Sequence, residues 1–257
     1  MLKRSITDFT VVENTTVGVG FFRLKLRHPR QLPQINAGQF VEVRTPDTAH
    51  TFLRRPISIH DVNYEDNTIS LLVKIAGNGT NLLSKLPIGA QLNLVYPLGN
   101  GFTLDAPYKK VLLAGGGVGI APLLYLGKVL KDKGVEVEFL FGARNAEGLL
   151  CLSDFEAIGK VNITTEDGSQ GTKGLVINHK VMDSITDFDT VTVCGPTPMM
   201  KAIAEICRKA NVNCEVSLEN KMACGIGVCL CCVTKTTEGH RCVCSDGPVF
   251  NINQLEW

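Results

Sequence analysis

The chain has 257 residues, of which 44% are hydrophobic and 20% charged, and its 26 Lys and Arg residues nearly balance 25 Asp and Glu. This near-neutrality argues against a partner held mainly by charge, such as nucleic acid or an anionic membrane. The composition excludes a largely disordered, collagen-like or coiled-coil chain, and the length suits two modest domains.

Cysteine placement bears on the cellular compartment. Of the 10 cysteines, six lie between Cys224 and Cys244. The N-terminus has basic residues but no apolar stretch behind them, and the longest uncharged run, 111–127, is too short to cross a membrane. We therefore expect a cytoplasmic protein without a transmembrane helix, whose cysteines are reduced or metal-bound.

The first part of the chain has the two-residue period of strands. Phe22, Leu24 and Leu26 alternate with basic residues, which puts the apolar side chains on one face. Further short strands are predicted over 39–44, 56–60, 69–75 and 91–96, with a helical turn or two over 81–86. This pattern predicts a six-stranded antiparallel β-barrel domain over 1–104.

The pattern changes near residue 105. An apolar run over 111–114, a glycine cluster, a helical pattern over 120–133 and a second apolar run over 135–141 form a βαβ unit. Later strands are predicted over 161–165, 190–194 and 213–218, and a helix over 198–210. We expect a doubly wound parallel α/β domain over 105–218.

The segment 219–257 loses this periodicity and is rich in cysteine and glycine, so we expect its order to depend on a cofactor. Its spacing, C-x4-C-x2-C with a fourth cysteine after eleven residues, is typical of a plant-type [2Fe–2S] site. The expected ligands are Cys224, Cys229, Cys232 and Cys244. Gly225 and Gly227 allow the backbone to approach the sulfurs.

Two alternatives remain for this segment. A structural zinc site usually uses two short C-x2-C pairs, and only Cys229 and Cys232 form one here. Cys231 and Cys242 are not assigned as ligands; each is either a small buried residue or a competing ligand. Cys242 is the alternative to Cys244 as the fourth ligand.

Two glycine-bearing turns follow predicted parallel strands, which is where an open sheet binds nucleotides. The first turn, Ala114-Gly115-Gly116-Gly117-Val118-Gly119, does not complete G-x-G-x-x-G, because Ile120 occupies the last glycine position, and a simple tight turn is the alternative. The second is Cys194-Gly195-Pro196. We expect both turns to hold a dinucleotide, and Met199 and Met200 to pack the helix that follows.

Two short motifs lie in the barrel half. Taken alone, Arg55-Pro56-Ile57-Ser58 is a surface segment and Gly77-Asn78-Gly79-Thr80 is a turn. Beside a nucleotide domain and a cluster they suit a flavin: Arg55 offers a planar donor fork to a phosphate, Ser58 a hydroxyl to the ring or ribityl chain, and Gly79-Thr80 a cradle for the diphosphate.

The order of these motifs resembles the ferredoxin–NAD(P)⁺ reductase superfamily. The tail, with Met222-Ala223-Cys224 and Cys244-Ser245-Asp246-Gly247-Pro248, resembles the electron-transfer subunits of NAD-dependent (class 1B) dihydroorotate dehydrogenase. The resemblance implies FAD held by 55–58, by Leu72-Val73-Lys74 and by Gly79-Thr80, and NAD as the electron acceptor. The superfamily often has tyrosine at the position of Ile57, so aromatic stacking on the flavin is not expected there.

The resemblance also implies the function. By this resemblance we expect a partner catalytic subunit with FMN to oxidise dihydroorotate, in a heterotetramer of two plus two chains, and this chain to pass the electrons on in pyrimidine biosynthesis. The alternatives are a reductase subunit serving a hydrogenase or a ferredoxin-dependent oxidoreductase, and a non-enzymatic zinc-bearing interaction module. The residues do not decide between NAD and NADP, because Arg144 is placed either to contact a 2′-phosphate or simply to cap a loop.

Overall fold

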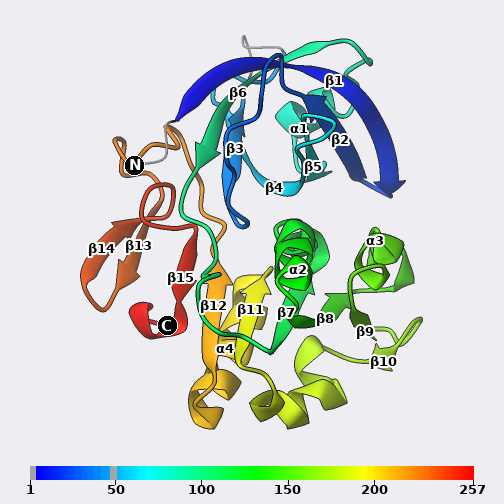
Figure 1. Cartoon of the computed structure of the whole chain (residues 1–257), viewed down its shortest axis with the longest axis vertical. Helices are drawn as coiled ribbons and strands as arrows, with labels where there is room; N and C mark the ends of the chain where they lie inside the picture. The colour runs from blue at the N-terminus through cyan, green and yellow to red at the C-terminus, as the bar shows by residue number, and fades with distance from the viewer. Residues whose placement is uncertain (1–3, 47–50) are drawn as a thin grey trace.

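The computed structural model describes residues 4–46 and 51–257. It has an upper barrel, a lower α/β domain and a C-terminal segment beside both (Figure 1). Residues 1–3, part of the N-terminal stretch in which the sequence predicts no export signal, lie outside the described ranges. None of the helices in those ranges combines the length and the hydrophobicity that a transmembrane segment needs.

The barrel is closed and six-stranded, as predicted, in the order β1-β2-β5-β4-β3-β6. Its strands are β1 (Ser5–Gly18), β2 (Phe21–Arg27), β3 (Phe40–Val43), β4 (Arg55–Asn63), β5 (Thr68–Lys74) and β6 (Gln91–Leu98). The sequence did not indicate β1, because Phe9 and Val11 are its only buried side chains and polar residues surround them. The helical turn expected over 81–86 is α1 (Asn78–Leu83), which begins earlier, inside the glycine motif.

The α/β domain has a seven-stranded sheet in the order β10-β9-β8-β7-β11-β12-β15. The bounds are β7 (Lys110–Gly116), β8 (Glu136–Ala143), β9 (Lys160–Thr165), β10 (Thr172–Lys173), β11 (Thr190–Cys194), β12 (Asn213–Ser217) and β15 (Val249–Asn251). Adjacent pairs from β10 to β12 are parallel, whereas β15 pairs antiparallel with β12. The C-terminal segment therefore extends the sheet of the preceding domain.

Helices cover both faces of this sheet. α2 (Leu123–Asp132) lies on the barrel side and contacts β4, while α4 (Thr197–Ala210) lies on the opposite face (Figure 1). The helix expected from residue 120 starts three residues later, because a 3₁₀ turn (Gly117–Ile120) precedes it. A short helix, α3 (Leu152–Glu156), was not predicted.

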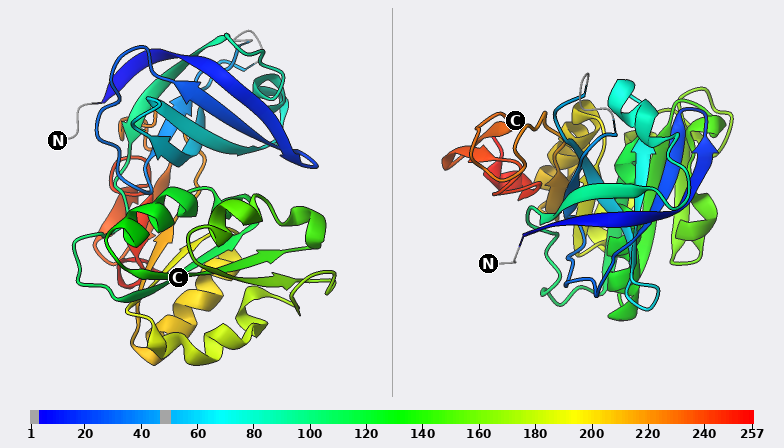
Figure 2. Two further views of the ribbon diagram at one scale, coloured as in Figure 1. Left: turned by 45° about the vertical axis from the view of Figure 1, so that its right-hand side comes forward. Right: turned by 90° about the horizontal axis from the view of Figure 1, so that it is seen from above.

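The C-terminal segment contains the hairpin β13 (Val233–Thr236) and β14 (Gly239–Cys242), then β15. Seen from above, it projects to one side of the barrel and the sheet (Figure 2). Asn100, in the connection between β6 and β7, holds it through backbone and side-chain hydrogen bonds to 245–247. Leu72 of the barrel and Val249 of this segment belong to one buried cluster with the α2 side of the sheet, so the three parts share a core.

Candidate functional site

The two nucleotide turns predicted from sequence contact each other at the carboxyl ends of β7 and β11. A Cβ added at Gly119 would lie 2.4 Å from the Cys194 carbonyl oxygen, and one at Gly195 would lie 2.9 Å from the Gly116 nitrogen. Because no side chain fits between these backbones, the turns form one continuous backbone surface. Gly117 has a left-handed φ of +55° and open space around it, so its backbone is free to face a ligand.

A groove of about 680 Å³ opens over these turns. Gly116, Gly117 and Pro196 line it from the α/β domain, and Lys74 lines it from the barrel. Met200 is buried as expected, but Met199 lines the groove. Arg144 and Glu166 also line it, and sequence reasoning missed Glu166 because it follows β9 without a motif. The groove combines an open glycine backbone with a volume that can hold a dinucleotide.

The thiol of Cys194 does not line this groove. The residue is completely buried, and burial raises the pKa of the thiol while Ser217 hydrogen-bonds to it. Cys194 therefore contributes its backbone, which contacts Gly119, and a neutral side chain beneath the turns.

The two barrel motifs also meet. A Cβ added at Gly79 would lie 2.8 Å from Nε and 3.1 Å from Nη2 of Arg55, so the guanidinium lies directly against the Gly79 backbone. Nη1 of Arg55 donates to the Leu53 carbonyl at 2.7 Å, which fixes the plane of the fork. A guanidinium beside a backbone that carries no side chain is suited to bind a phosphate group, so Arg55 and Gly79 fit the diphosphate of FAD.

The other predicted flavin-site residues of the barrel differ in burial and in hydrogen bonding. Pro56 and Ser58 are partly exposed, whereas Ile57 is 8% exposed and packs in the barrel core. Leu72 and Val73 are buried, which leaves their backbone and the exposed Lys74 side chain available to a flavin. The Thr80 hydroxyl accepts the Ala76 amide at 2.9 Å and donates to the Gly77 carbonyl at 3.1 Å. Thr80 therefore uses its hydroxyl to shape the loop.

Backbone amides in the cysteine loop point at sulfur. The amides of Ile226, Val228 and Cys229 lie 3.4–3.5 Å from Cys224 Sγ. Burial acts to raise the pKa of this thiol, but hydrogen bonds from these amides and from the Cys229 side chain outweigh it and lower the pKa to about 6. A thiolate stabilised by several amides is what an iron–sulfur cluster requires.

The remaining predicted ligands form a second pair. The Gly227 amide donates to Cys244 Sγ at 3.1 Å, and the Cys244 amide donates to Cys232 Sγ at 3.4 Å. Burial, then the Cys232 thiol, raises the pKa of Cys244, so two thiolates here need a cation to be stable. The Cys224 thiol contacts that of Cys229, and the Cys232 thiol contacts that of Cys244, which gives two thiol pairs and fits two irons. Cys231 is exposed. The Cys242 thiol is buried beside that of Cys232, and among the described residues no backbone amide of 224–232 donates to Cys242 Sγ.

Sequence reasoning missed Glu42 on β3. Its side chain is buried against Gly225, and neither carboxylate oxygen has a hydrogen-bond partner among the described residues. Burial raises its pKa to about 7 against the opposing charge of Arg54. No motif surrounds Glu42, and a single acidic residue within a predicted strand does not indicate a functional site.

Comparisons with known proteins agree with this arrangement. Three families match: an oxidoreductase FAD-binding domain over 8–102, an oxidoreductase NAD-binding domain over 113–205, and the iron–sulfur cluster binding domain of dihydroorotate dehydrogenase B over 219–256. The last match favours iron–sulfur over the zinc alternative. FAD-binding, NAD-binding and cluster-binding domains are thus all present.

Curated relatives carry the name dihydroorotate dehydrogenase B (NAD(+)), electron transfer subunit. The protein of Clostridium perfringens is 39% identical over 96% of both chains. That of Caldanaerobacter subterraneus is 44% identical over 83% of this chain and 84% of its own.

Solved structures share the fold. An NADH-dependent reduced ferredoxin–NADP oxidoreductase superposes over 100% of this chain and 92% of its own, with a TM-score of 0.86 and 31% identity. The ferredoxin reductase in carbazole 1,9a-dioxygenase, 20% identical with a TM-score of 0.70 over 82% of this chain and 67% of its own, shares the fold alone. Since a relative at 39% identity matches over 96% of both chains and the cluster segment matches the family's own iron–sulfur domain, the chain belongs to the electron transfer subunits of dihydroorotate dehydrogenase B.

Proposed function

We propose that this chain carries electrons from an FMN-containing dihydroorotate dehydrogenase catalytic subunit to NAD⁺, in the pyrimidine pathway that the relatives' name implies. The proposed order is partner, [2Fe–2S] cluster, FAD and NAD⁺. The proposed cluster ligands are Cys224, Cys229, Cys232 and Cys244. The proposed FAD site is 55–58, 72–74 and 79–80, and the proposed NAD site comprises Gly115, Gly116, Gly117, Gly119, Cys194, Gly195 and Pro196.

When bound, FAD exchanges single electrons with an iron–sulfur cluster and electron pairs with a nicotinamide, which is the conversion that this pathway needs. The chain's own residues position the reactants. Arg55 and the Gly79 backbone hold a diphosphate, while the 115–119 and 194–196 turns hold the dinucleotide over the strand ends. Amides from Ile226 to Cys229 stabilise the thiolates and so tune the cluster.

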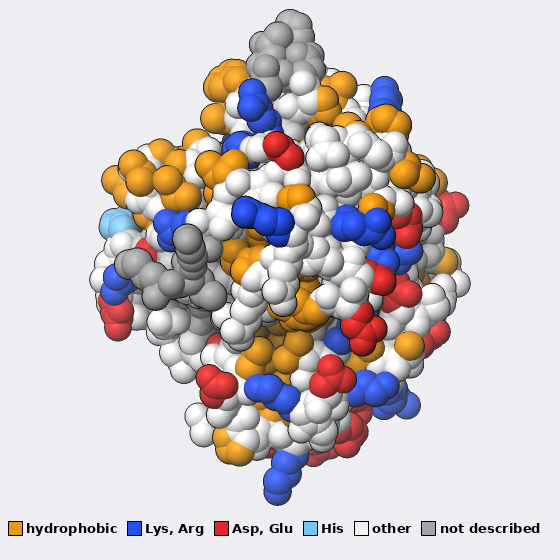
Figure 3. Space-filling model, turned by 45° about the horizontal axis from the view of Figure 1, so that its top comes forward, with side chains coloured by type: hydrophobic (Ala, Val, Ile, Leu, Met, Phe, Trp, Pro, Cys, Tyr) orange, Lys and Arg blue, Asp and Glu red, His pale blue; other side chains and the backbone are white. Residues whose placement is uncertain are grey.

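One observation supports this order above the others: the cysteine loop lies between the barrel and an exposed apolar rim. Gly225 packs on Glu42 of β3, and the Ile226 carbonyl accepts a hydrogen bond from Arg4 at 3.4 Å. On the outer side, Val228 is 75% and Leu230 64% exposed, and Phe52, 79% exposed, lines a hollow of about 510 Å³ together with Cys224. Hydrophobic side chains gather on this side of the molecule (Figure 3).

Exposed apolar residues of this size are characteristic of a surface that a partner covers. We infer that the catalytic subunit docks over the cluster loop, which places the cluster between the partner and the barrel. A heterotetramer of two plus two chains is the proposed assembly. The proposed functional boundaries are 1–104, 105–218 and 219–257.

The test is to express the chain anaerobically with and without its catalytic partner. The pair should reduce NAD⁺ with dihydroorotate, and the isolated chain should reduce a dye with NADH but leave dihydroorotate unchanged. Co-purification in equal amounts would support the assembly. A chain that lacks flavin and acid-labile sulfide, or that oxidises dihydroorotate alone, would contradict the proposal.

A second candidate has its own support. The 31% identical structure that matches over the whole chain is a reduced ferredoxin–NADP oxidoreductase, which makes service to a ferredoxin-linked partner the alternative. Cofactor spectra do not separate the two functions. Orotate production by the reconstituted pair does, because only a dihydroorotate dehydrogenase partner yields it.

A further inference from the structure

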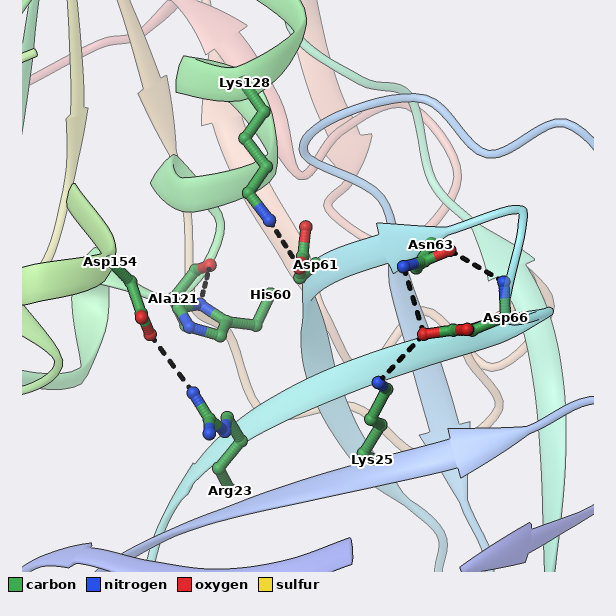
Figure 4. A network of polar contacts seen from close by, with 9 residues as sticks. All are labelled: Arg23, Lys25, His60, Asp61, Asn63, Asp66, Ala121, Lys128 and Asp154. Atoms are coloured by element: carbon green, nitrogen blue, oxygen red, sulfur yellow. Dashed lines mark hydrogen bonds and ion pairs between the residues drawn. The ribbon is translucent and has the colours of Figure 1, made fainter. Parts of the chain in front are cut away.

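His60 on β4 enters the seam between the barrel and the α/β domain with one ring nitrogen committed and the other free. It is 0% exposed, and its Nδ1 lies 2.8 Å from the Ala121 carbonyl oxygen (Figure 4). Since a carbonyl oxygen only accepts, Nδ1 carries the hydrogen and Nε2 presents a lone pair. Nε2 is buried and has no hydrogen-bond partner among the described residues.

Two further ligand-type side chains lie close to the His60 ring. Cys151 immediately precedes α3 and Asp154 lies within it, and one ligand atom from each lies within 4.8 Å of the others and of the His60 ring. Both belong to the α/β domain, so the group spans the two domains. Burial lowers the pKa of His60, which keeps the ring neutral and able to bind a cation at neutral pH.

We propose that His60, Cys151 and Asp154 form a binding site for one divalent cation of the zinc class. Nitrogen, thiolate sulfur and carboxylate oxygen together are ligands that a borderline-soft ion accepts. The surroundings have the features of a metal site, because the second ring nitrogen donates to a backbone carbonyl and Asp154 Oδ2 is held by Arg23 at 3.1 Å.

The site has room for a fourth ligand. A cavity of about 260 Å³ beside it is lined by His60, Asp61 and Asp154, and Asp61 Oδ1 is buried there without a partner among the described residues. A water molecule in this cavity completes four-coordination. On binding, the Cys151 thiol gives its proton to solvent as the metal–sulfur bond forms, and no oxidant or reductant is needed.

The nearby positive charges are already balanced. Arg23 also pairs with Glu13 at 3.2 Å, and Lys128 pairs with Asp61 at 2.7 Å. The cation therefore adds to a seam whose other charges are paired, and it links β4 to α3. This inference does not rest on the proposed function, because none of the three ligands belongs to the proposed cofactor sites.

The experiment uses the holoprotein with FAD and cluster in place, stripped of loose metal with a chelator and then titrated with Zn²⁺ against a chromophoric competitor. We expect one zinc per chain beyond the cluster iron. Zinc-edge X-ray absorption should show one sulfur at about 2.3 Å and nitrogen or oxygen ligands at about 2.0–2.1 Å.

Variants identify the ligands. Cys151→Ser and Asp154→Asn should each weaken zinc binding about 10- to 100-fold, as losing a ligand or its support typically does. Glu156→Gln, an exposed change in the same helix, and Cys231→Ser, an exposed thiol elsewhere, should leave the zinc affinity unchanged. Flavin and cluster absorbance report folding in every variant, so the partly exposed Cys151 and Asp154 carry the test even if His60→Gln does not fold.

Three results would overturn the proposal. The first is no zinc retained at micromolar free Zn²⁺, and the second is an affinity that Cys151→Ser leaves unchanged. The third is an all-sulfur shell, which would place the ion in the cysteine loop.

Discussion

Glu42 of the barrel packs directly on Gly225 of the cysteine loop, so that a Cβ added at Gly225 would lie 2.5 Å from Glu42 Cγ. Gly225 also has a left-handed φ of +66°. The loop that binds the cluster is thus pressed against the domain that binds the flavin, and a glycine makes that approach possible.

Gly225→Ala should therefore reduce cluster content while FAD remains bound. The substitution combines backbone strain of about 1–2 kcal/mol with a clash against a buried side chain. The measurement is iron and flavin per chain after anaerobic purification. Gly239→Ala is the matched control, because Gly239 has φ +96° but no atom within 4 Å of an added Cβ. Equal iron loss in the two variants would mean that strain alone is responsible.

Serine substitutions distinguish Cys244 from Cys242 as the fourth ligand. Cys244 Sγ accepts a hydrogen bond from the Gly227 amide of the cysteine loop at 3.1 Å. Cys242 is instead held through its backbone, because its amide donates to Asp246 Oδ2 at 2.7 Å. We expect Cys244→Ser to abolish or strongly shift the visible absorbance of the cluster, and Cys242→Ser to retain it. The reverse result would assign the ligand to Cys242.

Acid should destabilise the α/β domain through His179. Its Nδ1 accepts the Val181 amide at 3.1 Å and so caps the 3₁₀ segment Lys180–Asp187. Burial, then Lys180, lowers the pKa of His179. Because the folded-state pKa lies below the unfolded value of about 6.5, the unfolded chain takes up the proton first, and stability falls as the pH drops below that value.

His179→Asn keeps a capping acceptor but does not titrate. Its thermal midpoint should therefore fall less than that of the wild type between pH 7 and pH 5. His240→Asn, at an exposed position in β14, should follow the wild type. Parallel curves for all three proteins would refute the role of His179.

Local patterns of hydrophobic residues and glycines predicted most of this fold, because they reflect which side chains are buried and where the backbone turns. Alternation in β2 and the apolar runs of β7 and β11 correspond to strands with buried faces, and glycine spacing predicted the turns where backbones now touch. β1 escaped prediction because few of its side chains are buried. β15 escaped because three residues are too few to show a period, although pairing with β12 orders them.

Site residues without a motif were invisible for another reason. His60, Cys151 and Asp154 come together only when the barrel docks on the α/β domain, and nothing in their spacing records that contact. Glu42 likewise acquires its meaning from Gly225, far away in the chain. Cysteine spacing is informative because all the proposed cluster ligands lie within one segment.

Gly119→Ala should weaken NAD binding more than tenfold while flavin is retained. A Cβ at Gly119 would lie 2.4 Å from the Cys194 carbonyl oxygen and 2.6 Å from Gly195 Cα, so the two nucleotide turns must separate to admit it. Separation moves the backbone donors of both turns away from a common ligand. Titration of the oxidised holoprotein with NAD⁺, or of its NADH:dye reductase activity, measures the loss as a raised Kd or KM.

Gly134→Ala provides the comparison for this variant. Gly134 has φ +79° at the end of α2, with nothing within 4 Å of an added Cβ, so alanine there strains the backbone without touching the turns. We expect it to lower thermal stability, at a cost of about 1–2 kcal/mol, and to leave the affinity for NAD⁺ unchanged. If Gly119→Ala bound NAD⁺ as tightly as Gly134→Ala does, the contact between the turns would not hold the dinucleotide, and the site would lie elsewhere along the groove.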